Sequence, residues 1–270
     1  MALLSRMALR LVREGPTRRW LSVKRQTHAA LRLQSGACGL PHPQKRSTGG
    51  EDAWFICGDT VGVADGVGGW ARKGIDSGEY SRTLMSSAQR TVHAADKTPT
   101  PLQVLTVAHR SAQCPGSSTA CIVQLDDPEE MRATKWQVVH ETPNQCHYFN
   151  CPYQLGFGAN GDTPEMGEVY ELETQEGDLI VLGTDGLFDN LFPKQIASLL
   201  DTVLPSTPEL DQHSMEKVAS CIAHTAHKAA KGTKTKTPFA LAAQQAGYEY
   251  LGGKMDDITV VASLVTSDGA

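Results

Sequence analysis

Short apolar runs bounded by glycine or other turn residues alternate with amphipathic segments along most of the chain. Seven runs are rich in Val, Ile, Leu or aromatic residues and are too short for helices, which predicts strands; they cover residues 52–57, 61–65, 117–125, 136–139, 168–172, 179–183 and 258–265. Helical spacing of apolar residues predicts helices over residues 80–95 and 101–112 and two or three more between residues 193 and 247. Because strands do not alternate strictly with helices, the pattern favours mainly antiparallel sheets with helices packed outside them.

The charge of the chain is unevenly distributed. The net charge of −5 combines about +9 on residues 1–46, which hold ten basic residues and one acidic residue, with −14 on the remaining chain. An acidic body argues against a nucleic-acid partner, since phosphate backbones are bound by clustered Lys and Arg. The seven cysteines include no Cys-x-x-Cys pair, which is typical of a reducing compartment.

The basic N-terminal segment has the composition of a targeting sequence. Leu3, Leu4, Met7 and Leu11 recur at near-helical spacing, and arginines are displaced from them. This pattern predicts a mitochondrial transit peptide and linker over residues 1–45, a folded domain over residues 46–270, and a location in the mitochondrial matrix. The alternative interpretation is a disordered basic tail. No apolar run is long enough for a transmembrane segment.

Carboxylates at the ends of three predicted strands suggest a metal site. Asp65-Gly66 and Asp185-Gly186 each follow an apolar run, and Asp256-Asp257 precedes the last one. Several carboxylates that converge in a partly dry cleft require a cation. Oxygen ligands without His or Cys favour Mg²⁺ or Mn²⁺ over zinc.

Five motifs, in this order along residues 46–270, resemble those of the protein phosphatase 2C (PPM) family. They are Glu51-Asp52-Ala, Asp65-Gly66-Val-Gly-Gly, Gly116-Ser-Ser-Thr-Ala, Gly183-Thr-Asp185-Gly186-Leu-Phe-Asp189 and Asp256-Asp257-Ile-Thr-Val. Their form, together with His147-Tyr-Phe-Asn150, is similar to the mitochondrial branch of that family.

The resemblance implies an α+β fold, a four-layer α-β-β-α sandwich with two mainly antiparallel sheets, and a centre with two Mn²⁺ or Mg²⁺ ions. It implies that Asp65 bridges both ions, that the Gly66 carbonyl binds one of them, and that Asp185 and Asp256 hold the other. The position of Glu51 touches an ion through water, and Asp257 stands where the family usually has Asn. The nucleophile would be a hydroxide that bridges the metals, so no catalytic side chain is expected.

Two departures from the family pattern affect this expectation. Val67 replaces a His that helps to protonate the leaving group, and Val cannot transfer protons. The hairpin with a Gly-Asp-Ser-like motif is missing, because Leu125 is followed by an acidic stretch and then directly by Trp136. The family also binds phosphate with an Arg a few residues before the Glu51 position; Ser47 stands near that position in this chain, and the candidates are Lys45, Arg46 and Arg72.

These features predict a metal-dependent serine/threonine protein phosphatase that acts, as a monomer, on mitochondrial phosphoproteins. The missing hairpin leaves open an inactive phosphatase-like binding protein, and a different metal-dependent hydrolase is the second alternative. Other acidic residues receive structural interpretations. Asp59, Asp162 and Asp178 are predicted in turns, and Asp189 as the N-cap of a following helix.

Overall fold

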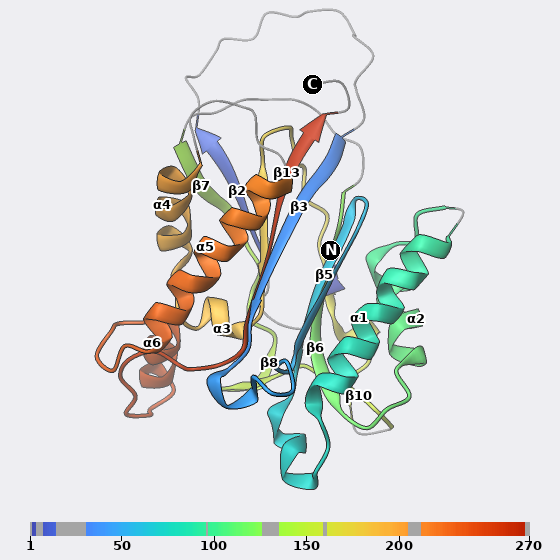
Figure 1. Ribbon diagram of the computed structural model, residues 1–270, viewed down its shortest axis with the longest axis vertical. Helices are drawn as coiled ribbons and strands as arrows, with labels where there is room; N and C mark the ends of the chain where they lie inside the picture. The colour runs from blue at the N-terminus through green and yellow to red at the C-terminus, as the bar shows by residue number, and fades with distance from the viewer. Residues whose placement is uncertain are drawn as a thin grey trace, which may run out of the picture.

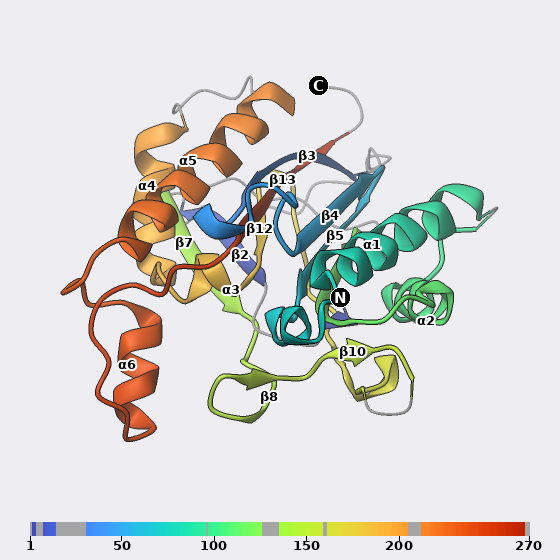
Figure 2. The same cartoon turned by 60° about the horizontal axis from the view of Figure 1, so that its bottom comes forward.

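Two antiparallel sheets lie face to face, and helices cover the outer face of each (Figures 1 and 2). The computed structural model describes residues 2–3, 8–14, 31–95, 97–125, 135–158, 161–204 and 212–267. The acidic stretch 126–134, where the sequence lacks the family hairpin, lies outside the described residues. The predicted α-β-β-α sandwich is confirmed.

The first sheet has the strand order β11-β1-β6-β5-β4, and β10 also pairs with β6. Its strands are β1 (Ala2–Leu3), β4 (Asp52–Cys57), β5 (Thr60–Gly66), β6 (Ser117–Gln124), β10 (Leu155–Gly156) and β11 (Glu168–Val169). Helices α1 (Ser77–Ala94) and α2 (Pro101–Ser111) cover it. Asp76 caps α1, and Thr100 with Gln103 forms a capping box on α2.

The second sheet has the order β3-β13-β12-β2-β7. Its strands are β2 (Ala8–Glu14), β3 (Leu31–Leu40), β7 (Lys135–Glu141), β12 (Leu179–Gly183) and β13 (Ile258–Ser267). Helices α4 (Pro193–Val203) and α5 (Gln212–Ala230) cover it, and the short α3 (Asp185–Phe188) follows β12. Two elements lie outside the four layers of sheets and helices. They are α6 (Pro238–Gln245) and the hairpin of β8 (Cys146–Tyr148) and β9 (Cys151–Pro152). None of the described helices combines the length and hydropathy that a bilayer crossing requires.

Three apolar layers separate the four structural layers. Val61, Val63 and Val261 belong to the layer between the sheets. Tyr80 and Leu84 of α1 pack onto the first sheet, and residues of α4 and α5 pack onto the second. Because β5, β6, β12 and β13 are covered on both faces, their sequences are almost continuously apolar rather than alternating.

The N-terminal segment supplies strands to both sheets, so folded structure begins before residue 46. Strand β3 pairs with β13 over ten residues, and β2 lies between β12 and β7. Leu9 and Leu11 are buried in the core, and the Arg10 guanidinium contacts the Asp178 carboxylate at 2.7 Å. Residues 8–11 do not follow the helical spacing that the sequence suggested, because Leu9 and Leu11 face the core as alternate residues of strand β2.

Strands β1 and β2 pair with strands that lie near the place of the missing hairpin. A sheet that has lost two strands exposes unpaired backbone groups. Here β1 pairs with β6, the strand after which the family hairpin would follow, and β2 separates β12 from β7. The N-terminal segment thus provides hydrogen-bond partners for β6, β12 and β7.

Candidate active site

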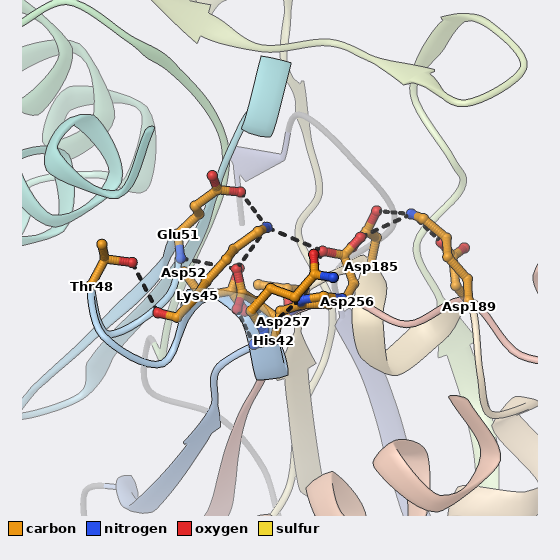
Figure 3. A network of polar contacts seen from close by, with 12 residues as sticks. His42, Lys45, Thr48, Glu51, Asp52, Asp185, Asp189, Asp256 and Asp257 are labelled. Atoms are coloured by element: carbon orange, nitrogen blue, oxygen red, sulfur yellow. Dashed lines mark hydrogen bonds and ion pairs between the residues drawn. The ribbon is translucent and has the colours of Figure 1, made fainter. Parts of the chain in front are cut away.

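The predicted site residues converge where strands from both sheets end. Asp65 is the penultimate residue of β5, Asp185 is the first residue of α3 after β12, and Asp256 precedes β13. Figure 3 shows Glu51, Asp256 and Asp257 around the Lys45 ammonium, with Asp185 next to Asp256. Asp65 lies opposite Asp52 in the β4–β5 pair, and Asp52 accepts a hydrogen bond from Thr184, the residue before Asp185, so Asp65 belongs to the same cluster.

Lys45 neutralises one side of this cluster. Its ammonium lies 2.5 Å from a Glu51 carboxylate oxygen, 3.2 Å from Asp257 and 3.7 Å from Asp256. Burial alone would lower the pKa of Lys45, but these carboxylates outweigh it and raise that pKa above its usual value. The end of the predicted leader and linker, residues 1–45, forms a 3-10 helix, Pro43–Lys45, which directs this side chain into the site.

Lys254 neutralises the other side. Its ammonium lies 2.6 Å from Asp185, 2.8 Å from Asp189 and 3.4 Å from Asp256. Burial opposes the charge of Lys254, yet attraction to Asp185 and the other carboxylates raises its pKa. Burial also raises the pKa of Asp189 to about 6, although Lys254 acts against this shift.

The central carboxylates disfavour one another's charge. Burial, reinforced by Asp185 and Asp52, raises the pKa of Asp65 well above its usual value. Burial also raises the pKa of Asp256, and Asp185 adds to this shift. The Oδ1 atoms of Asp52 and Asp185 are buried without a hydrogen-bond partner. Such a cluster gains most from cations of higher charge than lysine carries.

Backbone and threonine contacts hold the surrounding carboxylates in place. Asp257 is 2% exposed and accepts hydrogen bonds from the backbone amides of His42 and Glu51. Thr184 donates from its hydroxyl to Asp52 at 2.8 Å and accepts from the Thr259 amide at 3.0 Å. These contacts tie β4, β12 and β13 together directly behind the cluster.

The oxygen ligands of the acidic cluster are of the kind that two hard divalent ions prefer. Asp65, Asp185 and Asp256 offer oxygen atoms only, and Asp185 has an unsatisfied buried oxygen. Within the described residues, no three His, Cys, Asp or Glu side chains have the geometry to hold an ion as they stand. The two lysine ammonium groups lie among the carboxylates instead, so ion binding requires these ammonium groups to leave the carboxylates.

The structure corrects the predicted role of Asp189 and adds Lys254 to the residues of the acidic cluster. Asp189 does not cap α4, because it follows the last residue of α3 and pairs with Lys254, while Phe192 stands at the start of α4. Lys254 was missed by the sequence analysis. A lysine two residues before Asp256 was the available signal, but sequence does not show into which face such a side chain points. Of the basic candidates for phosphate binding, the structure brings Lys45 into the cluster.

His147 contacts Asp162, which lies outside the acidic cluster. Its Nε2 lies 3.0 Å from Asp162, which also accepts the backbone amide of Gln154. Asp59 pairs with Arg32 and Asp178 with Arg10. These three aspartates therefore stabilise the fold outside the acidic cluster.

Gly186 permits the closest backbone approach in the site. A Cβ atom there would lie 1.9 Å from the carbonyl oxygen of Asp257. Gly186→Ala is therefore expected to lower the free energy of unfolding by about 3 kcal/mol and to displace Asp185 from Asp257. A Cβ at Gly69 meets no atom within 4 Å, so Gly69→Ala serves as the matched control. Urea denaturation of both variants checks this; equal stabilities would contradict the close approach.

Comparison with known proteins identifies the family. No family model matches the chain. The probable protein phosphatase 2C 80 of Arabidopsis thaliana is 45% identical over 252 residues, covering 88% of this chain and 60% of that protein. The probable protein phosphatase 2C 1 of Oryza sativa subsp. japonica is 35% identical over 258 residues, covering 86% of this chain and 75% of that protein. The chain belongs to the protein phosphatase 2C family.

Solved structures agree with this assignment to the protein phosphatase 2C family. The X-ray structure of the photosystem II phosphatase PBCP matches with a TM-score of 0.75 and 32% identity, over 87% of this chain and 99% of that one. The catalytic domain of the serine/threonine phosphatase PstP, solved with two manganese ions, matches with a TM-score of 0.57; at 16% identity it shows the fold alone. The chain spans 60% and 52% of the length of two Arabidopsis relatives, phosphatases 80 and 55.

Proposed function

We propose that this chain is a metal-dependent serine/threonine protein phosphatase. The observation that carries the proposal is the convergence of Asp65, Asp185 and Asp256 at the ends of strands from two sheets, in a member of the protein phosphatase 2C family. Two Mn²⁺ or Mg²⁺ ions would be held by Asp65 between them, by the Gly66 carbonyl on one ion, and by Asp185 and Asp256 on the other. Glu51 would contact an ion through water.

The ions would neutralise phosphoryl oxygens and acidify the attacking water. The residues of the chain hold this arrangement rigid, because the ligands sit on strand ends and Asp257 accepts two backbone amides behind them. Val67 cannot donate a proton, so the leaving oxygen takes its proton from solvent. Phosphoserine or phosphothreonine would be the substrate, in keeping with the protein phosphatase 2C family to which the chain belongs.

The test is phosphate release from a phosphothreonine peptide by the purified full chain. Mn²⁺ or Mg²⁺ is expected to support turnover, a chelator to abolish it, and added metal to restore it. Calorimetry should count two ions. Absence of phosphate release from a folded protein with two bound ions would contradict the enzymatic proposal and favour a phosphoprotein-binding role. Faster turnover of nucleotides or sugar phosphates than of the peptide would favour a different hydrolase.

We expect Lys45 to bind the substrate phosphate. Once divalent ions take over the carboxylates, the ammonium of Lys45 is released beside them for the phosphoryl oxygens. Lys45→Ala should raise KM for the phosphopeptide by about five- to tenfold. Arg46 is the exposed neighbour of Lys45, so Arg46→Ala is the matched control and should leave KM unchanged. Equal KM values for the two variants would contradict the assignment.

We also propose that the basic N-terminal segment directs the chain to mitochondria, where it would act on phosphoproteins of that compartment as a monomer. The composition of residues 1–46 supports this location. A fluorescent fusion of the whole chain, compared with a fluorescent protein that carries residues 1–45 alone, tests it without removing strands β2 and β3 from the fold. Plastid or cytosolic fluorescence of the whole-chain fusion would overturn the proposal.

A further inference from the structure

A lobe at residues 231–251, here called the α6 lobe, projects from the body next to the acidic cluster (Figure 2). It contains α6 and the loops on both sides of that helix. The backbone amide of Phe239 donates to the carbonyl of Asp189 at 3.0 Å, and Thr237 donates to the Gly252 carbonyl at 2.7 Å. The lobe is therefore hydrogen-bonded to the two backbone segments that contain Asp189 and Lys254.

Aromatic rings connect the site with the surface of the lobe. The ammonium of Lys254 lies 5.2 Å from the centre of the Phe239 ring, and Phe239 contacts Phe149 of the β8–β9 hairpin at 5.6 Å. Phe149 in turn stacks on Tyr248 at 5.2 Å. Tyr248 is 60% exposed and Leu251 is 70% exposed. Large apolar side chains are thus offered to solvent beside the predicted metal site.

The lobe also has a charge opposite to that of the body. Lys231, Lys234 and Lys236 are exposed, and Glu249 is the acidic residue of residues 231–251. In the part of the chain that the structure describes, none of these three lysines takes part in an ion pair. A net charge of about +2 on the lobe contrasts with −14 on the chain after residue 46, so the lobe attracts anionic groups that the body repels.

We infer that the α6 lobe docks the phosphoprotein substrate, and that it takes an acidic segment next to the phosphorylated residue. The inference rests on the proposed phosphatase function and adds the substrate class. Carboxylates of the substrate pair with Lys231, Lys234 and Lys236, and an apolar side chain packs on Tyr248 and Leu251. Continuity of the aromatic contacts from Lys254 to Tyr248 places this surface beside the phosphate rather than on a remote face.

Three substrates separate docking from chemistry. p-Nitrophenyl phosphate has no flanking residues, whereas two phosphothreonine peptides carry either three acidic residues and a leucine or uncharged residues at the same positions. The variant K231A/K234A/K236A should raise KM for the acidic peptide by about five- to tenfold, with kcat unchanged. Its kinetics on p-nitrophenyl phosphate and on the uncharged peptide should stay at the wild-type values.

The matched control, R90A/K97A/K217A, removes the same charge from exposed positions on α1, the loop after it and α5. It should leave all three KM values unchanged. The wild-type KM for the acidic peptide should also rise with salt, because exposed ion pairs are screened. Tyr248→Ala should raise KM for the peptide with leucine more than for one with glycine in its place.

The inference is overturned if the lobe variant and the control give the same KM for the acidic peptide. It is also overturned if a single-stranded oligonucleotide, added as competitor, displaces the acidic peptide and binds the lobe more tightly. A wild-type protein that hydrolyses none of the substrates contradicts the proposed function instead. In that case fluorescence anisotropy of the labelled acidic phosphopeptide still tests the docking surface. The inference requires the peptide to bind wild type more tightly than it binds the lobe variant.

Discussion

Asp65→Asn is expected to reduce kcat/KM on a phosphopeptide by about a hundredfold to a thousandfold, since it removes the charge shared between both proposed ions. The same change should raise the melting temperature of the metal-free protein at neutral pH. Asp65 is half-buried beside Asp185, Asp52 and Asp256, so its charged form destabilises the fold until cations arrive. A loss of activity together with a gain of stability distinguishes a functional carboxylate from a structural one.

The pH dependence has a defined sign. The pKa of Asp65 is raised in the folded chain, so folding retains a proton that the unfolded chain releases near its ordinary pKa of about 3.9. The stability that this group contributes is present below that pKa and is lost as pH rises through the folded value. Melting curves of chelator-treated protein should therefore fall with rising pH less steeply for Asp65→Asn than for wild type.

Asp59→Asn is the matched control for this experiment. Asp59 lies in the β4–β5 turn and pairs with Arg32, away from the acidic cluster. Its substitution should leave kcat/KM and the pH slope of the metal-free protein unchanged. Wild-type activity in Asp65→Asn, or a melting temperature lowered as much as in a core mutant, would contradict the role given to Asp65.

Leu11→Ala is expected to lower the free energy of unfolding by about 3 kcal/mol, and deletion of residues 1–14 to leave the chain largely unfolded. Leu11 is fully buried in the core between the second sheet and its helices. Deletion would also remove β2, which pairs with both β12 and β7, and leave Asp178 without Arg10. Urea denaturation and the yield of soluble protein measure both effects.

Leu251→Ala provides the control for Leu11→Ala, because Leu251 is 70% exposed and should cost less than about 0.5 kcal/mol. A synthetic peptide of residues 1–16 should restore structure to the truncated chain, as strand addition to an open sheet predicts. Equal stabilities of the two leucine variants, or a truncated chain with wild-type stability, would show that β2 is not part of the folded unit.

Local sequence patterns predicted much of the fold. The helix predicted over residues 80–95 is α1 at Ser77–Ala94, and that over 101–112 is α2 at Pro101–Ser111. The strand at 168–172 is shorter than predicted, since β11 covers only Glu168–Val169. Strands β2 and β3 were not predicted, because a basic segment with sparse leucines has the composition of a leader whether or not its backbone joins a sheet.

The sequence by itself determined the acidic residue types at three strand ends, because Asp-Gly after an apolar run is a local signal, and their order along the chain carried the family resemblance. Only the tertiary structure decided which basic groups meet those carboxylates. Lys45 arrives from a 3-10 helix and Lys254 from the loop before β13, and contacts between residues about 70 positions apart, such as Lys254 with Asp185, leave no mark in a local pattern. The partners of β12 are likewise a property of the assembled sheet, since strand pairing depends on which edge is open and not on the strand alone.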